Sequence, residues 1–120
     1  MTTEYLFIND NNETISSGRS DLILSPVPDE FALHQNYPNP FNPVTTINYD
    51  LPKQSYVNLY IYDILGREVA NLVGLVMPPG YQSVVWNTNN NLGISVSAGI
   101  YFYQIQTKEF IKTKKMVILK

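Results

Sequence analysis

The chain has 120 residues, no cysteine and a formal net charge of −2, which leaves room for one domain and excludes disulfides and thiolate chemistry. Only 15% of the residues are charged, and nine tyrosines and five phenylalanines favour strands over helices. Residues 51–120 carry seven basic residues against three acidic ones, an excess that can attract nucleic acid or lipid headgroups or can simply solvate a strand edge.

Residues 1–30 are predicted to be a linker or the tail of an upstream region. The short apolar runs at 5–8 and 21–24 are separated by polar, turn-forming residues, so one run could also dock on the domain as a strand. Pro26 and Pro28 make the end of this region an extended connector. The first residues lack the basic start and apolar run of a signal peptide, so we expect the signal of an exported protein to lie elsewhere.

The segment 36–43 reads NYPNPFNP. Its three prolines impose an extended backbone with few hydrogen-bond donors, which cannot lie inside a sheet. Phe41 and Tyr37 are expected to anchor the segment against the core. We therefore interpret it as a rigid strap that leads to the first strand.

From residue 44 onward, apolar residues recur at every second position, which is the period of a strand with one buried face. The residues predicted to face the core are Ile47, Tyr49 and Leu51 in a strand at 44–51, and Val57, Leu59 and Ile61 in a strand at 56–62. A turn at 63–66, in which Gly66 is expected to have a positive φ, leads to a strand at 67–72. These two strands are predicted to form a hairpin.

The remaining chain continues this pattern of short strands and turns. We expect, in order, a turn at 77–80, a strand at 81–86, a polar loop at 87–93, a central strand at 99–107, a tight turn at 108–109 and a last strand at 110–120. Six or seven strands without a helical period predict an all-β, antiparallel β-sandwich of about seven strands.

No constellation of residues indicates catalysis or metal binding. The acidic residues fall in separate strands or turns, and no carboxylate or oxyanion loop completes a triad with His34. The oxygen-rich runs at 10–13 and 87–91 lack the alternating carboxylates of a calcium loop. No apolar run approaches the ~20 residues that span a bilayer. We therefore expect no enzyme active site, no metal or other cofactor and no membrane span.

Tyr56, Tyr60 and Tyr62 alternate with the aliphatic residues of their strand. Such a face can stack on saccharides or contact a partner protein, or it can pack against a second sheet or simply carry strand-favouring residues. Two other functions therefore stay open: a carbohydrate-binding or adhesion module, and a self-assembling subunit in which residues 1–30 add a strand to a neighbouring copy.

Several separated segments, in order, resemble the type A C-terminal sorting domain of the type IX secretion system (Por secretion). They are QNYPNPFNP at 35–43, TINYDLP at 46–52, LYIYDILGREV at 59–69, AGIYFY at 98–103 and TKKMVILK at 113–120. The resemblance implies an immunoglobulin-like sandwich over residues 31–120. Such a domain directs a larger cargo protein through the periplasm to the cell surface or the medium.

The resemblance also implies partners and site residues. The partners are the outer-membrane secretion machinery and a surface sorting peptidase that cuts upstream of Phe31; no nucleic acid is implied. The proline motif of the family corresponds to Pro38 and Pro40, and its glycine–tyrosine motif to Gly99 and Tyr101.

The basic terminal strand of the family corresponds to Lys114, Lys115 and Lys120. A terminal edge strand offers unpaired backbone groups as well as side chains, so a receptor could add a strand to it. We expect recognition to involve Lys114, Lys115, Val117, Leu119 and Lys120.

Overall fold

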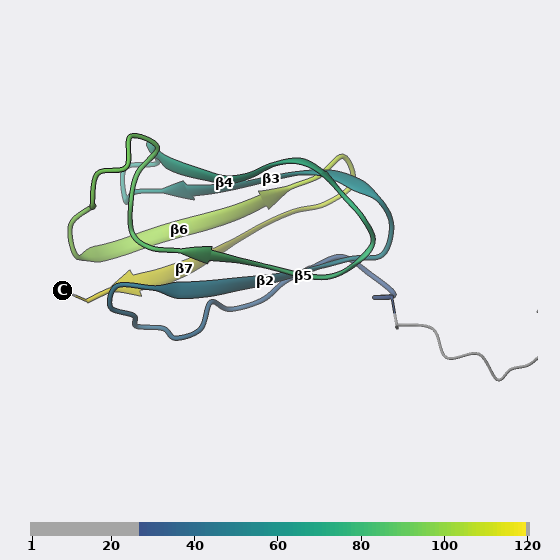
Figure 1. Cartoon of the computed structure of the whole chain (residues 1–120), viewed down its shortest axis with the longest axis horizontal. Helices are drawn as coiled ribbons and strands as arrows, with labels where there is room; N and C mark the ends of the chain where they lie inside the picture. The colour runs from purple at the N-terminus through teal and green to yellow at the C-terminus, as the bar shows by residue number, and fades with distance from the viewer. Residues whose placement is uncertain (1–26, 120) are drawn as a thin grey trace, which may run out of the picture.

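The computed structural model describes residues 27–119, which form seven strands and no helix (Figure 1). The strands in chain order are β1 (Ala32–Leu33), β2 (Thr45–Leu51), β3 (Ser55–Tyr62), β4 (Glu68–Met77), β5 (Gly80–Trp86), β6 (Gly99–Gln106) and β7 (Ile111–Ile118). They build two antiparallel sheets, with the orders β1-β2-β5 and β4-β3-β6-β7. This arrangement confirms the predicted all-β, immunoglobulin-like sandwich of seven strands.

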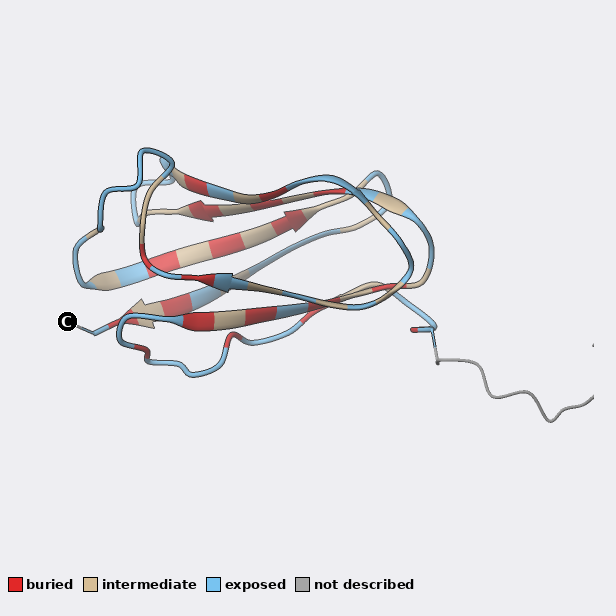
Figure 2. Ribbon diagram, in the orientation of Figure 1, coloured by how far each residue is buried: buried red, intermediate tan, exposed pale blue. Residues whose placement is uncertain are grey.

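The core lies between the two sheets and follows the alternation of the sequence. All six residues predicted to face inward are buried, namely Ile47, Tyr49, Leu51, Val57, Leu59 and Ile61. Figure 2 shows the resulting bands, in which buried residues alternate with less buried ones along the strands. Burial of each such side chain stabilises the fold by about 1.5–3 kcal/mol, so these positions determine which face of each strand points inward.

The hairpin of β3 and β4 is confirmed, and Gly66 has the expected positive φ, at 83°. Asp63 stabilises the turn by accepting hydrogen bonds from the backbone N–H groups of Leu65 and Arg67, both at 2.9 Å. The pKa of Asp63 is held below its ordinary value, chiefly by the hydrogen bond from the backbone N–H of Arg67. The other hydrogen bonds to this carboxylate lower the pKa further. The predicted end of the second strand at residue 72 is wrong, because β4 continues to Met77, and register shifts in the β3–β4 ladder interrupt the simple alternation.

The turn predicted at 77–80 leads from one sheet to the other. Only Pro78 and Pro79 separate β4 from β5, yet β5 pairs with β2 in the three-stranded sheet. β6 is central, as predicted, because β3 and β7 flank it. The two ends of the described chain lie at opposite ends of the sandwich (Figure 1).

Most of the region predicted as a linker, residues 1–26, lies outside the described residues, and so does Lys120. Within residues 27–119, no helix is long and apolar enough to cross a membrane.

Candidate recognition site at the carboxyl end of β7

β7 is an edge strand whose residues alternate between the core and the outer face of its sheet. Met116 and Ile118 are buried. Lys115, Val117 and Leu119 therefore point to the outer face, where Lys115 is exposed and half of Leu119 is accessible.

Lys114 does not share this surface. Lys114 lies two residues before the buried Met116, so its side chain points to the same face of the sheet as Met116, and it is half-buried. Lys114 and Lys115 therefore point to opposite faces of the sheet. The residues predicted from the sequence therefore divide between two faces, and Lys120 lies outside the described part of the chain.

The strap closes the backbone edge of β7 near its carboxyl end. The N–H of Phe41 donates to the carbonyl of Val117 at 3.1 Å, and the N–H of Leu119 donates to the carbonyl of Phe41 at 2.8 Å. The N–H of Val117 donates to Oδ1 of Asn39 at 3.0 Å. Phe41 itself is buried, as predicted, and forms a parallel bridge with Ile118.

A further bond extends the covered part of this edge. Nε2 of Gln35 donates to the carbonyl of Lys115 at 2.9 Å. The predicted unpaired edge is therefore wrong from Lys115 to Leu119, because Gln35 and residues of the strap already occupy backbone groups that a receptor strand would need. The backbone groups of an edge strand point alternately toward its neighbour and toward the open edge. Ile111 and Thr113 therefore direct their backbone groups to the same edge as Lys115, but they lie beyond the strap contacts.

A buried polar network holds the strap against the core. The backbone N–H of Asn36 donates to Oη of Tyr103 at 2.8 Å, and this hydroxyl donates to the carbonyl of His34 at 2.7 Å. Nδ2 of Asn36 donates to Oγ1 of Thr45 at 2.9 Å and to the carbonyl of Pro38 at 3.2 Å. Burial raises the pKa of Tyr103 to about 12. The phenol is therefore neutral and able to donate throughout the physiological range.

Sequence reasoning missed Asn36 and misplaced Tyr37. Tyr37 was expected to anchor the strap, but 78% of it is exposed. Its backbone exchanges two hydrogen bonds with Thr46, at 3.0 and 2.9 Å. Because adjacent residues of an extended chain point to opposite sides, the inward position belongs to Asn36.

Gly99 and Tyr101, the predicted glycine–tyrosine motif, lie near the carboxyl end of β7, where Trp86 links Tyr101 to the strap. The ring of Phe41 lies 6.1 Å from Trp86, and the ring of Trp86 lies 5.9 Å from Tyr101 in an edge-on arrangement. Gly99 pairs with Ile118 in the β6–β7 ladder and has a φ of 141°, which favours glycine.

The two motif prolines lie on the exposed side of the strap. Pro38 accepts hydrogen bonds through its carbonyl oxygen, and Pro40 directly precedes the buried Phe41. The peptide bonds before Pro38, Pro40 and Pro43 are cis.

A hollow of about 440 Å³ adjoins Gly99 and Tyr101. The turn between β3 and β4 contributes Ile64 and Leu65, which are 67% and 74% exposed. Ile100 lines the same hollow and is 40% exposed. Accessible apolar side chains therefore lie beside the end of β7.

The outer face next to β7 is aromatic. In the register of the sheet, Tyr62 lies opposite Phe102, and Phe102 lies opposite Lys115. The rings of Tyr60 and Tyr62 are 5.9 Å apart on this face. The alternative in which the tyrosines pack against the second sheet is therefore wrong, since the core lies on the other side of β3.

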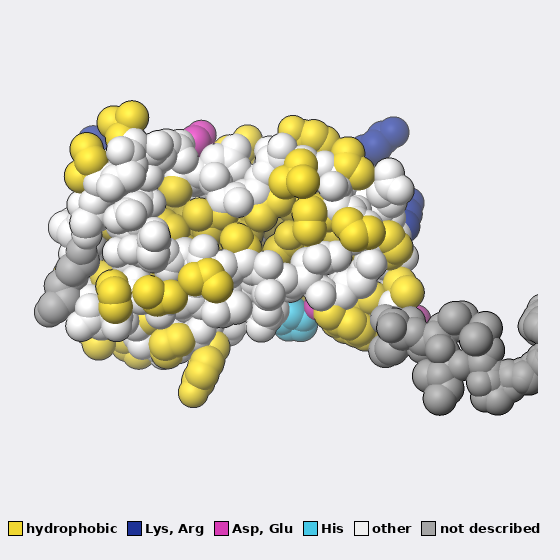
Figure 3. Space-filling model, viewed as in Figure 1, with side chains coloured by type: hydrophobic (Ala, Val, Ile, Leu, Met, Phe, Trp, Pro, Cys, Tyr) yellow, Lys and Arg dark blue, Asp and Glu magenta, His cyan; other side chains and the backbone are white. Residues whose placement is uncertain are grey.

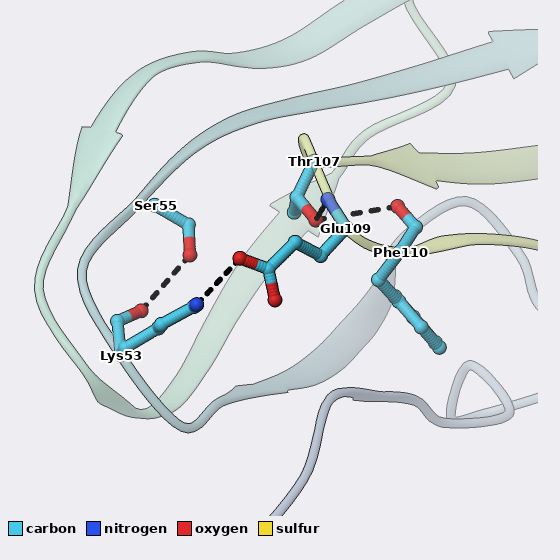
Figure 4. Close-up of polar contacts among 5 residues, drawn as sticks. All are labelled: Lys53, Ser55, Thr107, Glu109 and Phe110. Carbon is cyan, nitrogen blue, oxygen red and sulfur yellow. Dashed lines mark hydrogen bonds and ion pairs between the residues drawn. The ribbon is translucent and has the colours of Figure 1, made fainter.

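The opposite end of the sandwich is where residues 27–31 join the domain. Phe31 stacks on Phe110 with ring centroids 5.4 Å apart. Close by, Lys53 forms an ion pair with Glu109, and the N–H of Glu109 donates to Oγ1 of Thr107 at 3.2 Å (Figure 4). This end is therefore separated from the carboxyl end of β7 by the length of the sandwich.

The polar groups singled out in the sequence have structural partners. Nε2 of His34 lies 2.9 Å from Oδ2 of Asp50. Oδ1 of Asn90 accepts the N–H groups of Leu92 and Ile94, which is a turn-forming role. Within residues 27–119, no group of three or more His, Cys, Asp and Glu side chains is placed to hold a metal ion.

Comparison with known proteins identifies a family whose model matches this chain and solved structures with a similar fold. A family model described as "Secretion system C-terminal sorting domain" matches residues 35–119. No curated protein matches the chain.

Two solved structures from Porphyromonas gingivalis resemble this fold. One is PorZ, "an essential bacterial surface component of the type-IX secretion system", with a TM-score of 0.52 and 21% identity over 77% of this chain. The other is "dimeric latent PorU", with a TM-score of 0.62 and 19% identity over 82% of this chain. The match spans only 12% of the PorZ chain and 10% of the PorU chain, and at these identities it establishes the fold alone.

Proposed function

The chain belongs to the type IX secretion C-terminal sorting domains, and from this premise we propose that the export machinery of the outer membrane recognises it at the carboxyl end of β7. A domain of this family is a sorting signal and is not itself catalytic. It is part of a larger cargo protein and implies export to the cell surface or the extracellular space.

The closed edge of β7 is the observation that carries this proposal. Because Gln35 and the strap occupy backbone groups from Lys115 to Leu119, a receptor meets side chains there. Direct contact is assigned to Lys115, Val117 and Leu119, which share the outer face. Lys114, on the other face, and Lys120 add longer-range attraction to an acidic receptor surface.

In this proposal the family motifs maintain the surface and do not contact the receptor. Pro38 and Pro40 shape the strap, and Gly99 and Tyr101 support the end of β7 from the neighbouring strand. Their substitution is expected to lower export by loosening this end of the sandwich.

The proposal assigns residues 1–30 to a linker and residues 31–120 to the sorting domain. The stack of Phe31 on Phe110 supports placing Phe31 within the sorting domain. A surface peptidase that cuts upstream of Phe31, after the protein has passed the periplasm, would leave the sandwich intact.

Export of a reporter fused upstream of the chain tests the recognition site. Deletion of residues 114–120 is unsuitable, because it also removes the buried Met116 and Ile118. We expect Lys115→Glu to lower export at least about tenfold, because a reversed charge at a central contact costs about 1.4 kcal/mol or more of receptor affinity.

The matched control is Lys112→Glu, which makes the same charge change at an exposed position of the same strand. It should export like the parent, and both variants should keep the thermal midpoint of the parent. Equal export of the Lys115 and Lys112 variants would rule out the proposed contact.

A further inference from the structure

Among residues 27–119, β5 is an edge strand without the protection that the other edges of this sandwich have. The loop after β5 covers part of β4, since the N–H of Asn91 donates to the carbonyl of Val69 at 3.1 Å and Oδ1 of Asn91 accepts the N–H of Asn71 at 2.9 Å. β7 carries lysines and the strap, and β1 has only two residues. β5 contains no charged residue and no proline, which are the usual means of preventing edge pairing.

The hydrogen bonds of β2 indicate which backbone groups of β5 have no partner within the part of the chain that the structure describes. The carbonyls of Thr46 and Asn48 accept bonds from the side opposite to β5, where the strap and the end of β1 lie. Their cross-strand neighbours in β5 are Val85 and Ser83. By the alternation of an antiparallel ladder, Tyr81, Ser83 and Val85 therefore direct their N–H and carbonyl groups to the open edge.

The side chains beside this edge indicate a missing strand. Leu75 of β4 lies opposite the buried Val57 and therefore points into the sandwich, yet 52% of it is exposed. Tyr81 and Val85 are 63% and 58% exposed. Figure 3 shows apolar side chains gathered along this side of the molecule, in the region of β4 and β5, with few charged side chains among them. One more strand next to β5 would shield Leu75 and satisfy the open backbone groups.

We propose that a second copy of this chain supplies that strand, through antiparallel pairing of β5 with β5 centred on Ser83. In this register Tyr81 lies opposite Val85 of the second copy, and the reverse pair follows by symmetry. Pairs of an aromatic and a β-branched residue are favourable across strands. The three outward residues of each copy would form about six backbone hydrogen bonds.

The charges of the edge favour a second copy over a different partner strand. β5 offers no charge that an acidic or a basic strand could pair with, whereas two uncharged edges meet without like-charge repulsion. The inference rests on this edge alone and does not depend on the sorting function.

Measurement of the mass of the purified 120-residue chain between about 1 μM and about 1 mM tests the pairing. We expect a dimer whose fraction rises with concentration. Ser83→Lys and Ser83→Glu should each weaken it at least about fivefold, because they place like charges directly opposite one another. An equimolar mixture of the two variants should restore dimerisation to the level of the parent.

Asn48→Lys is the matched control, since Asn48 is exposed and is the cross-strand neighbour of Ser83 on the same face. It should dimerise like the parent. A chain that stays monomeric at every concentration overturns the proposal. It is also overturned if Ser83→Lys dimerises as well as Asn48→Lys, or if the mixture shows no recovery.

Discussion

Replacing Tyr103 by phenylalanine removes one oxygen atom from a side chain with no accessible surface. That oxygen accepts the backbone N–H of Asn36 and donates to the carbonyl of His34. The substitution leaves the N–H of the buried Asn36 without its partner, at about 1–3 kcal/mol, and loses a second hydrogen bond worth about 1 kcal/mol. We expect Tyr103→Phe to lower the free energy of unfolding by about 3 kcal/mol, which lowers the midpoint of thermal unfolding by roughly 12–24 °C.

Urea and thermal unfolding of the whole chain measure this loss, with Tyr56→Phe as the matched control. The hydroxyl of Tyr56 also donates to a backbone carbonyl, that of Gly74 at 3.1 Å, but it does so at the surface, where water replaces the bond at a cost below about 0.5 kcal/mol. Equal stability of the two variants would refute the claim that Tyr103 ties the strap to β6.

Amide hydrogen exchange separates loss of the strap from general destabilisation. The N–H groups of Val117 and Leu119 donate to Asn39 and Phe41 of the strap. If Tyr103 holds the strap, protection of these two amides should fall by roughly 100-fold in Tyr103→Phe, as about 3 kcal/mol requires. In Tyr103→Phe these two amides should exchange through local opening of the strap, at a lower free energy than the amides of β7 that pair with β6 and exchange with global unfolding. Equal protection of the two groups of amides in the variant would argue against a role of Tyr103 in holding the strap.

The remaining predictions concern alkaline pH, two glycines and the buried ring of Phe41. Because the pKa of Tyr103 is about 12 in the folded chain and 10 in the unfolded chain, its contribution to stability is complete below pH 10. It declines by up to about 2.7 kcal/mol as pH rises toward 12, and urea titrations at several pH values should show a smaller decline in Tyr103→Phe. Gly99→Ala, at a φ of 141°, should lower the free energy of unfolding by about 1–3 kcal/mol in urea unfolding. Gly74→Ala, whose new Cβ would meet Oδ1 of Asn58 at an ordinary 3.6 Å, should change it by less than about 0.5 kcal/mol. Phe41→Ala should cost about 3–5 kcal/mol in the same assay through the cavity beside Trp86.

Alternation predicted the inward faces of β2 and β3 because the pleat of a strand is a local property. Whether neighbouring strands pair is not local. The sequence predicts a turn at 77–80, but nothing in the residues of that turn tells whether β4 and β5 form a hairpin or belong to different sheets. The answer depends on the pairing of β5 with β2. In this pairing Trp86 of β5 lies opposite Thr45 of β2, which is far away in the sequence.

The strap shows a second limit of sequence reasoning. Hydrophobicity favours Tyr37 as the buried residue and Asn36 as the exposed one, and the structure reverses both. Burial of Asn36 is tolerated because its polar groups find partners on Thr45 and Tyr103, which lie 9 and 67 residues away. No pattern within residues 36–43 carries that information, whereas the burial of Phe41 could be anticipated from its size and apolar character.

The strand that carries the proposed recognition residues also contributes side chains to the core. Met116 and Ile118 are buried between the residues assigned to recognition, and the strap that closes the edge of β7 is held by Tyr103 on the neighbouring strand. In an unfolded chain the backbone from Lys115 to Leu119 would be open, and its side chains would share no common face. A receptor that reads Lys115, Val117 and Leu119 as one surface therefore recognises the folded sandwich. Substitutions in the strap should then reduce export although, in the proposed arrangement, no strap residue touches the receptor.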